Sequence, residues 1–477
     1  MASSHRRTFL KASLGLPFAL RKLSSTSPVV DVDLEARQGW MRVAGRRAYL
    51  YGYNGQVPGP MIEARPGDHV RVRFRNGLAE PTNIHYHGLH VSPSGNADNV
   101  MLHIPAGEVL IYEFDLPANH RGGTFWYHPH VHESVARQVS RGLAGVFIVR
   151  GELDQIPEIA SAPEAALVLQ DFSLSSRGDP LEANMMERMM GREGGLVTAN
   201  GQINPALPIQ RDGWLRLRIL NASSSRFHRI QLEEHPLHVI ATDGGAQAAP
   251  EERDEILLLP GERVEVMVRG NRPAGQYRLL SRPYNRGGMM GMGMQMGGSM
   301  GSGMMGMSMM GRAPSASSGP QVLATLNYQG RAAKTWNLPQ QLVRIDPLPE
   351  PTVYRTFQLG GGMGMGMMMG GRMNFTINGR TFDPDRIDTR AALNTVEEWE
   401  FVNSSMMDHP MHIHTNPFQV VDPGGGAARS WKDMVLVRAG DRVRVRAAFR
   451  DFTGTVMYHC HILDHEDLGM MGQLEIT

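Results

Sequence analysis

The sequence contains one cysteine, Cys460, in 477 residues. Because no second cysteine is present, the chain cannot form an internal disulfide, and a disulfide-stabilised scaffold is excluded. No apolar run is long enough to span a bilayer. The formal net charge of +1 provides no general field that would attract nucleic acid or an anionic membrane surface. We therefore expect neither a nucleic-acid partner nor a membrane partner.

Glycine, proline and methionine are abundant. The chain has 54 glycines, 30 prolines and 33 methionines, and it shows little sustained helical periodicity. This combination favours many short strands joined by turns. A chain of this length is too long for a single hydrophobic core, and the usual domain size suggests about three domains.

One sequence pattern occurs three times, at residues 53–76, 199–221 and 377–403. Each copy contains an Asn-Gly turn and then an alternating apolar and polar run, which ends at Asn76, Asn221 or Asn403. Such alternation is typical of a half-buried strand. We predict an all-β protein of three tandem Greek-key β-sandwich domains, at about 30–150, 160–328 and 345–477.

Histidines form four clusters, and in a strand the two histidines of an H-x-H pair point to the same face. The intervals from Asn76 to the first pair equal those from Asn403 to the third pair, whereas the middle domain has Ile230 and Leu232 at these positions. We expect histidines of the first and third domains to surround one copper, zinc or iron cluster at their interface. The clusters are His85 and His87; His128 and His130; His409, His412 and His414; and His459, His461 and His465.

Cys460 lies between His459 and His461, so its side chain points to the opposite face of the strand. His409, His465 and Met470 are available to complete its surroundings. A thiolate with two imidazoles and a weak thioether is the ligand set of a blue-copper electron-transfer site. Structural zinc is the alternative, but a closed four-coordinate zinc site does not require two groups of ligands.

With these motifs, "HYHG", "WYHPH", "HPMHIH" and "HCHILDHEDLGMM", the sequence resembles the multicopper oxidase family, in particular bacterial laccases and periplasmic cuprous oxidases. The resemblance implies cupredoxin-like domains and four copper ions, of which one is type 1, one type 2 and two type 3. It also implies dioxygen as electron acceptor. The implied ligands are His409, Cys460, His465 and Met470 for type 1; His85 and His412 for type 2; and His87, His128, His130, His414, His459 and His461 for type 3.

Oxygen reduction consumes protons, so an acid near the cluster is expected. Glu466 matches the acidic relay position of the family, and Asp98 matches the acid that follows the first motif. A solvated surface carboxylate is the alternative for each of them.

Two glycine and methionine segments, 289–311 and 360–373, suggest the substrate, because thioethers select Cu(I) over harder ions. Met407 and Asp408, directly before His409, are the candidate Cu(I)-binding residues. Phenols and aromatic amines are alternative donors, and methionine can also act as flexible apolar filler. Two further alternatives are a copper-sequestering or carrier protein without turnover and a structural protein of the cell envelope. Relatives of the last kind lack copper ligands.

Residues 1–29 resemble a twin-arginine export signal and an N-terminal tail. Arg6 and Arg7 precede Thr8 and Phe9, and a short apolar stretch follows. This pathway moves folded proteins that already hold their cofactors, so we expect a periplasmic or otherwise exported protein. We expect it to act as a monomer.

Overall fold

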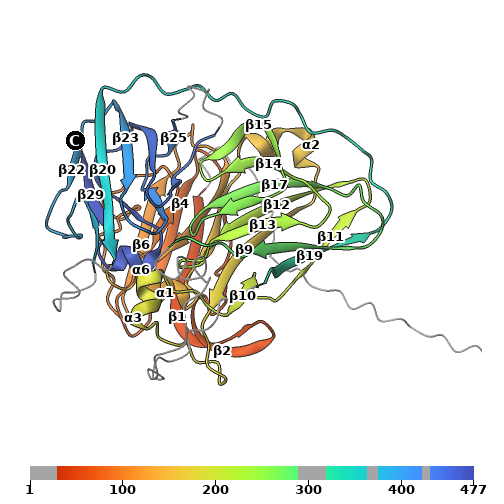
Figure 1. Cartoon of the computed structure of the whole chain (residues 1–477), viewed down its shortest axis with the longest axis horizontal. Helices are drawn as coiled ribbons and strands as arrows, with labels where there is room; N and C mark the ends of the chain where they lie inside the picture. Colours follow the sequence, from red (N-terminus) through yellow and green to blue (C-terminus); the bar gives the residue numbers. More distant parts are fainter. Residues whose placement is uncertain (1–28, 288–318, 363–373, 422–429) are drawn as a thin grey trace, which may run out of the picture.

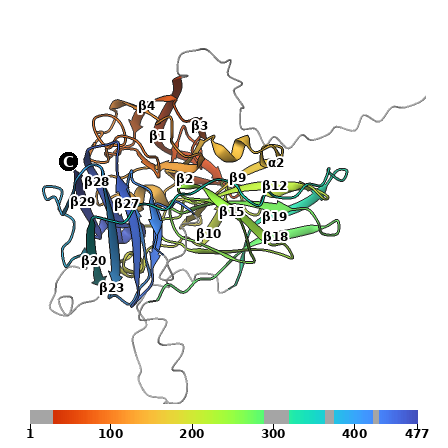
Figure 2. The same ribbon diagram turned by 90° about the horizontal axis from the view of Figure 1, so that it is seen from above.

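A computed structural model describes residues 29–287, 319–362, 374–421 and 430–477. The predicted export signal apart from Val29, all of the segment 289–311 and most of 360–373 lie outside these residues. The described chain forms six β-sheets, which follow one another in three pairs and confirm the predicted all-β fold. In Figures 1 and 2 the first pair is red and orange, the middle pair green and the third pair blue, and each domain borders the other two.

The first domain consists of two four-stranded sheets. One has the strand order β2-β1-β4-β6 and the other has β3-β8-β7-β5. The strands are β1 (Val29–Val43), β2 (Arg46–Tyr53), β3 (Ile62–Ala64), β4 (His69–Gly77), β5 (His85–His87), β6 (Val109–Asp115), β7 (Gly123–His128) and β8 (Gly145–Val149).

The middle domain pairs a six-stranded sheet, β10-β9-β12-β17-β14-β15, with a five-stranded sheet, β11-β19-β18-β13-β16. The strands are β9 (Glu164–Phe172), β10 (Leu196–Ala199), β11 (Ala206–Gln210), β12 (Trp214–Asn221), β13 (His228–Leu232), β14 (Leu237–Thr242), β15 (Gly245–Arg253), β16 (Ile256–Leu258), β17 (Arg263–Arg269), β18 (Gln276–Arg282) and β19 (Gln321–Gln329).

The third domain has two five-stranded sheets, β21-β20-β23-β27-β25 and β22-β29-β28-β24-β26. The strands are β20 (Val353–Gly362), β21 (Asn374–Ile377), β22 (Thr389–Ala391), β23 (Thr395–Asn403), β24 (His409–Ile413), β25 (Phe418–Val420), β26 (Met434–Val437), β27 (Arg442–Phe449), β28 (Gly454–Cys460) and β29 (Met471–Ile476).

Helices are few and short. They are α1 (Val135–Ser140), a 3₁₀ turn η1 (Glu152–Gln155), α2 (Pro157–Ala160), α3 (Met185–Met190) and α6 (Leu463–Asp467). α1, α3 and α6 come from different domains and lie close together in the lower left part of Figure 1, where α6 contacts both other helices. No helix among the described residues has the length and apolar character needed to cross a bilayer.

The three domains repeat the same strand pairings. β1 and β4, β9 and β12, and β20 and β23 are parallel pairs, and the strand after each repeat pairs with β7, β18 or β28 in an antiparallel ladder. The repeated sequence pattern therefore encodes a repeated topology. The domain boundaries predicted above stay a prediction.

The asparagine that ends each copy of the pattern explains why it recurs. Asn76, Asn221 and Asn403 are buried, and in each the side-chain amide donates to two backbone carbonyls of nearby segments while its oxygen accepts a backbone N–H two residues later. Each asparagine thereby satisfies buried backbone groups in the turn that leads to the next strand. In the first and third domains that strand carries the histidines.

Candidate metal centre

Strand pairing brings the histidine motifs together within each domain. His85 on β5 lies opposite His128 on β7, and His412 on β24 lies opposite His459 on β28. The two domains then face each other, and the rings of His85 and His414 stack at 3.9 Å between centroids. The rings of His87 and His412 stack at 3.8 Å. All eight predicted cluster histidines are buried, namely His85, His87, His128, His130, His412, His414, His459 and His461.

Several imidazole nitrogens in this cluster have no hydrogen-bond partner among the described residues. They include Nε2 of His85, His412 and His461. In two of these rings the other nitrogen, Nδ1, has a hydrogen-bond partner. His85 Nδ1 donates to Asp98 at 3.0 Å, and His412 Nδ1 donates to the Asp433 carbonyl at 2.9 Å. Their Nε2 atoms therefore carry free lone pairs, which is the arrangement of metal-binding histidines.

A second group consists of His130, His414 and His459, whose ligand atoms lie within 4.8 Å of one another. His459 Nδ1 donates to the Cys460 carbonyl at 3.1 Å, so its Nε2 carries the lone pair. That Nε2 lies 2.9 Å from His414 Nε2 and 3.3 Å from His130 Nε2. A bound cation is the natural partner for nitrogens that converge in this way.

His87 presents the other ring nitrogen to the cluster. Its Nε2 donates to Asp433 Oδ1 at 3.2 Å, so its free nitrogen is Nδ1, which lies 3.4 Å from His128 Nε2. His128 Nδ1 donates to the Pro129 carbonyl at 2.9 Å, which leaves the Nε2 lone pair of His128 free as well. The ring of His461 lies beside both, with centroids 5.0 Å from His87 and 5.7 Å from His128.

Burial keeps these imidazoles neutral. Removal from water, together with the neighbouring histidines, lowers the pKa of His85, His412 and His461 well below the usual value. Neutral imidazole is the form that binds a metal ion, so the cluster is prepared for metal without loss of protons from these rings.

The two predicted acids lie on different sides of the cluster. Burial raises the pKa of Asp98, which is bonded to His85, to about 8. Burial also opposes ionisation of Glu466, but the adjacent His459 and His130 outweigh it and lower the pKa of that carboxyl. Glu466 Oε2 lies 3.0 Å from His459 Nδ1, and Oε1 lies 3.4 Å from His130 Nε2. Neither predicted acid is a solvated surface charge.

The second predicted site surrounds Cys460 on the other face of β28. Cys460 Sγ lies 3.5 Å from His409 Nδ1 and 3.8 Å from His465 Nδ1, and the three residues form a potential metal-ligand group. Met470 is fully buried, and its carbonyl accepts the Cys460 N–H at 3.0 Å. Burial raises the pKa of the Cys460 thiol, so a metal ion that binds there must displace its proton.

The far nitrogens of the two imidazoles have different environments. His409 Nε2 lies 2.9 Å from the Ser405 hydroxyl, in the segment that carries the exposed side chain of Met406. His465 Nε2 donates to the Met189 carbonyl at 2.9 Å, at the end of α3 from the middle domain. Both bonds direct Nδ1 towards Cys460. Sequence reasoning missed Ser405 and Met189, although the four methionines of α3 were a visible compositional signal.

The predicted Cu(I)-binding residues Met407 and Asp408 are buried. The Asp408 carboxylate accepts hydrogen bonds from the Tyr284 hydroxyl at 2.6 Å and from the Ala439 N–H at 2.8 Å. The exposed thioether in this segment belongs to Met406, whose side chain is 57% exposed.

The middle domain contributes no residue to the potential ligand groups found among the described residues. Ile230 and Leu232, which take the places of ligand histidines in the repeat, are buried in the apolar core of that domain. In the middle domain, apolar core side chains therefore occupy the positions at which the other two domains hold histidines.

Sequence reasoning also missed Asp433 and Arg263. Asp433 contacts two cluster histidines, and Arg263 of the middle domain binds Asp433 through both terminal nitrogens. Arg263 and Asp433 are 170 positions apart, and no local motif marks either of them.

The donor set fits copper. The cluster offers imidazole nitrogens, and the second site offers a thiol, two imidazoles and a buried thioether in an apolar environment that includes Phe375 stacked on His465. Imidazoles suit copper, and a sulfur-rich site with two histidines is the blue-copper ligand set. The predicted ligands thus lie in two groups that meet at the stretch from His459 to His461.

Comparisons with known proteins agree with this arrangement. Models described as multicopper oxidase match residues 35–154, 167–295 and 351–477. Multicopper oxidase mco of Staphylococcus haemolyticus is 29% identical over 436 residues, which is 89% of this chain and 83% of that protein. Cell division protein FtsP of Yersinia pestis is 28% identical over 505 residues, 99% of this chain and 98% of that protein.

Among solved structures, the multicopper oxidase of Campylobacter jejuni, described as a metallo-oxidase, has a TM-score of 0.80 and 32% identity. The match covers 96% of this chain and 93% of that chain. Together with the family models across all three domains, this similarity shows that the chain belongs to the multicopper oxidase family.

Proposed function

We propose that this protein couples one-electron oxidation of Cu(I), or of a phenol or aromatic amine, at the Cys460 site to four-electron reduction of dioxygen to water at the histidine cluster. Copper bound at these residues would supply the one-electron redox chemistry and the site of oxygen reduction. We assign one type 1 ion to the Cys460 group, and one type 2 and two type 3 ions to the eight histidines.

The observation that carries the proposal is the position of Cys460 between two cluster ligands. Its Sγ faces His409 and His465, whereas the flanking residues His459 and His461 face the cluster. An electron at Cys460 Sγ can therefore reach the imidazole of His459 or of His461 through the covalent bonds of these three consecutive residues. A protein that only stores copper does not need this connection.

The surroundings of the two type 1 histidines indicate the side on which a donor binds. His465 Nε2 is covered by the Met189 carbonyl, whereas His409 Nε2 contacts Ser405, next to the exposed Met406. A thioether at this position suits Cu(I). The description of the Campylobacter protein as a metallo-oxidase supports a metal ion as the donor.

Glu466 is in position to handle protons at the cluster. Its carboxylate is buried between His130 and His459, and neither oxygen has a hydrogen-bond partner among the described residues. Such a carboxylate can accept a proton at Oε1 or Oε2 and deliver it to oxygen being reduced nearby. Asp98 is hydrogen-bonded to His85 Nδ1 and is therefore placed to orient that imidazole.

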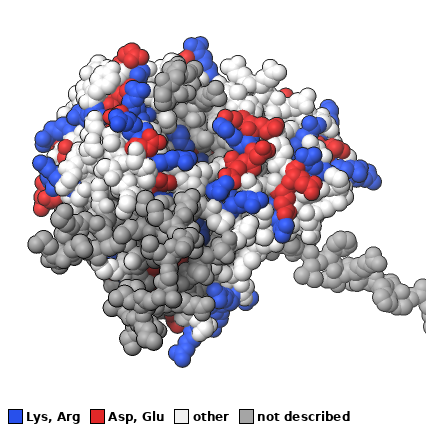
Figure 3. Space-filling view, viewed as in Figure 1, with Lys and Arg blue, Asp and Glu red and all other residues white. Residues whose placement is uncertain are grey.

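A role in cell division is the second candidate, because proteins named FtsP match the whole chain. Overall sequence similarity does not distinguish an oxidase from a cell-division protein, so the presence of metal-binding side chains must decide between them. Two complete groups of buried ligands favour redox chemistry over a structural role alone. On the face shown in Figure 3, the described basic and acidic side chains are intermixed, which does not favour a polyanionic partner at this face.

Oxygen uptake of the copper-loaded protein is the decisive measurement. We expect uptake with Cu(I) or an aromatic donor, about four coppers per chain and a monomer in size-exclusion chromatography. Copper binding without oxygen uptake for any donor would support the carrier alternative. Absence of bound copper would favour a structural function.

Export through the twin-arginine pathway is part of the proposal and rests on residues 5–20. Replacement of Arg6 and Arg7 by lysine should retain the protein in the cytoplasm, as measured by cell fractionation. An unchanged distribution would contradict this route.

A further inference from the structure

Arg263 is a fully buried arginine at the point where all three domains meet. Its Nε donates to the Thr124 carbonyl of the first domain at 3.0 Å, and its terminal nitrogens donate to the Gly261 and Asp243 carbonyls of its own domain at 3.2 and 2.9 Å. The same two nitrogens bind Asp433 of the third domain at 2.7 and 2.5 Å. All five N–H groups of the guanidinium are thus used.

Asp433 connects this arginine to the histidine cluster. Its Oδ1 accepts from His87 Nε2 at 3.2 Å and lies 3.7 Å from His412 Nδ1, which donates to the Asp433 main-chain carbonyl at 2.9 Å. One residue thus contacts a ligand candidate from the first domain and another from the third. The bond to Nε2 also fixes the tautomer of His87 that leaves Nδ1 free.

The middle domain also approaches the cluster through its backbone. A Cβ atom on Gly261, which has φ +87°, would lie 2.8 Å from the ring of His461. A Cβ atom on Gly88, beside His87, would lie 2.5 Å from Asp433 Oδ2. No larger residue fits at either position, so the contact between Arg263, Asp433 and the cluster is closely packed.

We propose that Arg263 and Asp433 are positioning residues through which the middle domain, whose described residues contribute no ligand, sets the tautomer and orientation of His87 and His412. The inference rests on the proposed function of the cluster as the copper site. Arg263 holds the Asp433 carboxylate in one orientation and compensates its buried charge, and Asp433 in turn holds the two imidazoles. Such outer contacts typically change metal affinity by about 10- to 100-fold.

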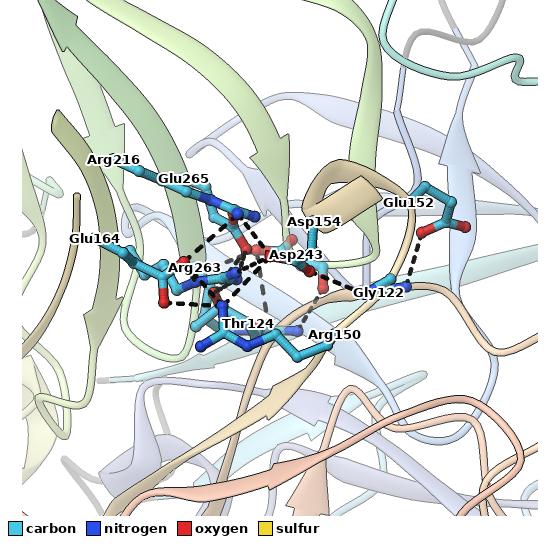
Figure 4. A network of polar contacts seen from close by, with 12 residues as sticks. Gly122, Thr124, Arg150, Glu152, Asp154, Glu164, Arg216, Asp243, Arg263 and Glu265 are labelled. Carbon is cyan, nitrogen blue, oxygen red and sulfur yellow. Dashed lines mark hydrogen bonds and ion pairs between the residues drawn. The ribbon is translucent and has the colours of Figure 1, made fainter. Parts of the chain in front are cut away.

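A neighbouring ion-pair network offers a matched control. Figure 4 shows Arg216 and Glu265 in the same buried region as Arg263 and Thr124. Glu265 binds Arg216 at 2.6 Å and the Thr124 hydroxyl at 2.8 Å, but no contact joins it to a histidine among the described residues. Loss of its charge weakens the same interface and leaves the histidines untouched.

The test compares Asp433→Asn and Arg263→Lys with Glu265→Gln in the full-length protein. Asp433 Oδ1 accepts from both Arg263 and His87, so an asparagine that keeps its oxygen there turns its NH2 group towards the other terminal nitrogen of Arg263, donor against donor, and loses the negative charge. Lysine at position 263 keeps the positive charge but loses the two-pronged guanidinium geometry. We expect Asp433→Asn to bind cluster copper about tenfold more weakly or worse and to change the paramagnetic resonance signal of the type 2 copper. The blue absorption of the Cys460 site should stay, and Arg263→Lys should give a smaller change of the same kind.

Thermal unfolding of the metal-free variants separates positioning from stability. Glu265→Gln should lower the melting temperature yet keep normal copper content and the wild-type resonance signal. The proposal fails if Asp433→Asn keeps both as well, or if Glu265→Gln loses copper in the same proportion. None of these readouts requires turnover, so a wild type that binds copper but reduces no oxygen would overturn only the proposed function.

Discussion

The two ligand groups of this protein are assembled in different ways. The group around Cys460 comes entirely from one domain, between His409 and Met470. The histidine cluster takes half of its predicted ligands from the first domain and half from the third, and its outer contacts reach the middle domain through Arg263. The predicted ligands of the Cys460 site thus come from a single sandwich, with one orienting contact from the Met189 carbonyl of the middle domain, whereas the cluster depends on the docking of three sandwiches.

This difference has a physical consequence. A change that loosens the contact between domains should disturb the cluster before it disturbs the Cys460 site, because domains can shift as bodies while each core stays closely packed. Variants that affect one site and spare the other therefore test the division directly.

Cys460→Ser should have the largest effect. The hydroxyl cannot replace the thiolate of a blue-copper site, so the blue absorption should disappear and oxygen uptake should fall to background. Copper at the histidine cluster should remain, because its ligands lie on the opposite face of β28. Full turnover in this variant would show that electrons do not enter through Cys460.

Glu466→Gln should act on the cluster alone. The amide keeps the shape of the side chain but cannot relay protons, so the rate of oxygen reduction should fall about 10²-fold. The absorption of the Cys460 site should not change. Stopped-flow reoxidation of the reduced protein measures the step directly, and a wild-type rate would assign the proton supply elsewhere.

Met470→Leu should act on the Cys460 site alone. Leucine fills a similar buried volume and removes the weak axial thioether, which should raise the reduction potential of that copper. A potentiometric titration measures the shift, and the oxidation rate should change by roughly a few-fold. Loss of cluster copper in this variant would contradict the separation of the two sites.

Two changes test the donor side of the Cys460 site. Met406→Leu and deletion of 289–311 should each slow Cu(I) oxidation while phenol oxidation stays the same or rises. The reason is that thioethers bind Cu(I) and contribute little to phenol binding. If the variants oxidise Cu(I) and phenols at the wild-type rates, these methionines serve only in apolar packing.

The smallest effect is expected in the repeated asparagines. Asn221→Ala removes buried hydrogen bonds in the middle domain and should cost about 1–3 kcal/mol of stability without altering copper content. Asn403→Ala should cost a similar amount but should also disturb the Cys460 site, because Asn403 binds the Met407 carbonyl near His409. Thermal unfolding and copper analysis of the pair provide the comparison.

Much of the candidate site could be predicted because its pattern is local. Two histidines separated by one residue in a strand share a face, and equal intervals from Asn76 and Asn403 placed His85 and His412 in matching strands. Asp98 and Glu466 could be placed beside the cluster only by resemblance. The environment of Asp408 was not predictable, because its partner Tyr284 comes from the middle domain.

The sequence by itself determined the all-β repeat, the two groups of ligand residues and the position of Cys460 between them. These features depend on residue order and on the two-residue period of a strand, which a single sequence displays. Only the tertiary structure decided which nitrogen of each histidine is free, and it alone revealed Asp433 and Arg263. Those properties depend on contacts such as the one between His87 and Asp433, which are 346 positions apart and meet only when the domains dock.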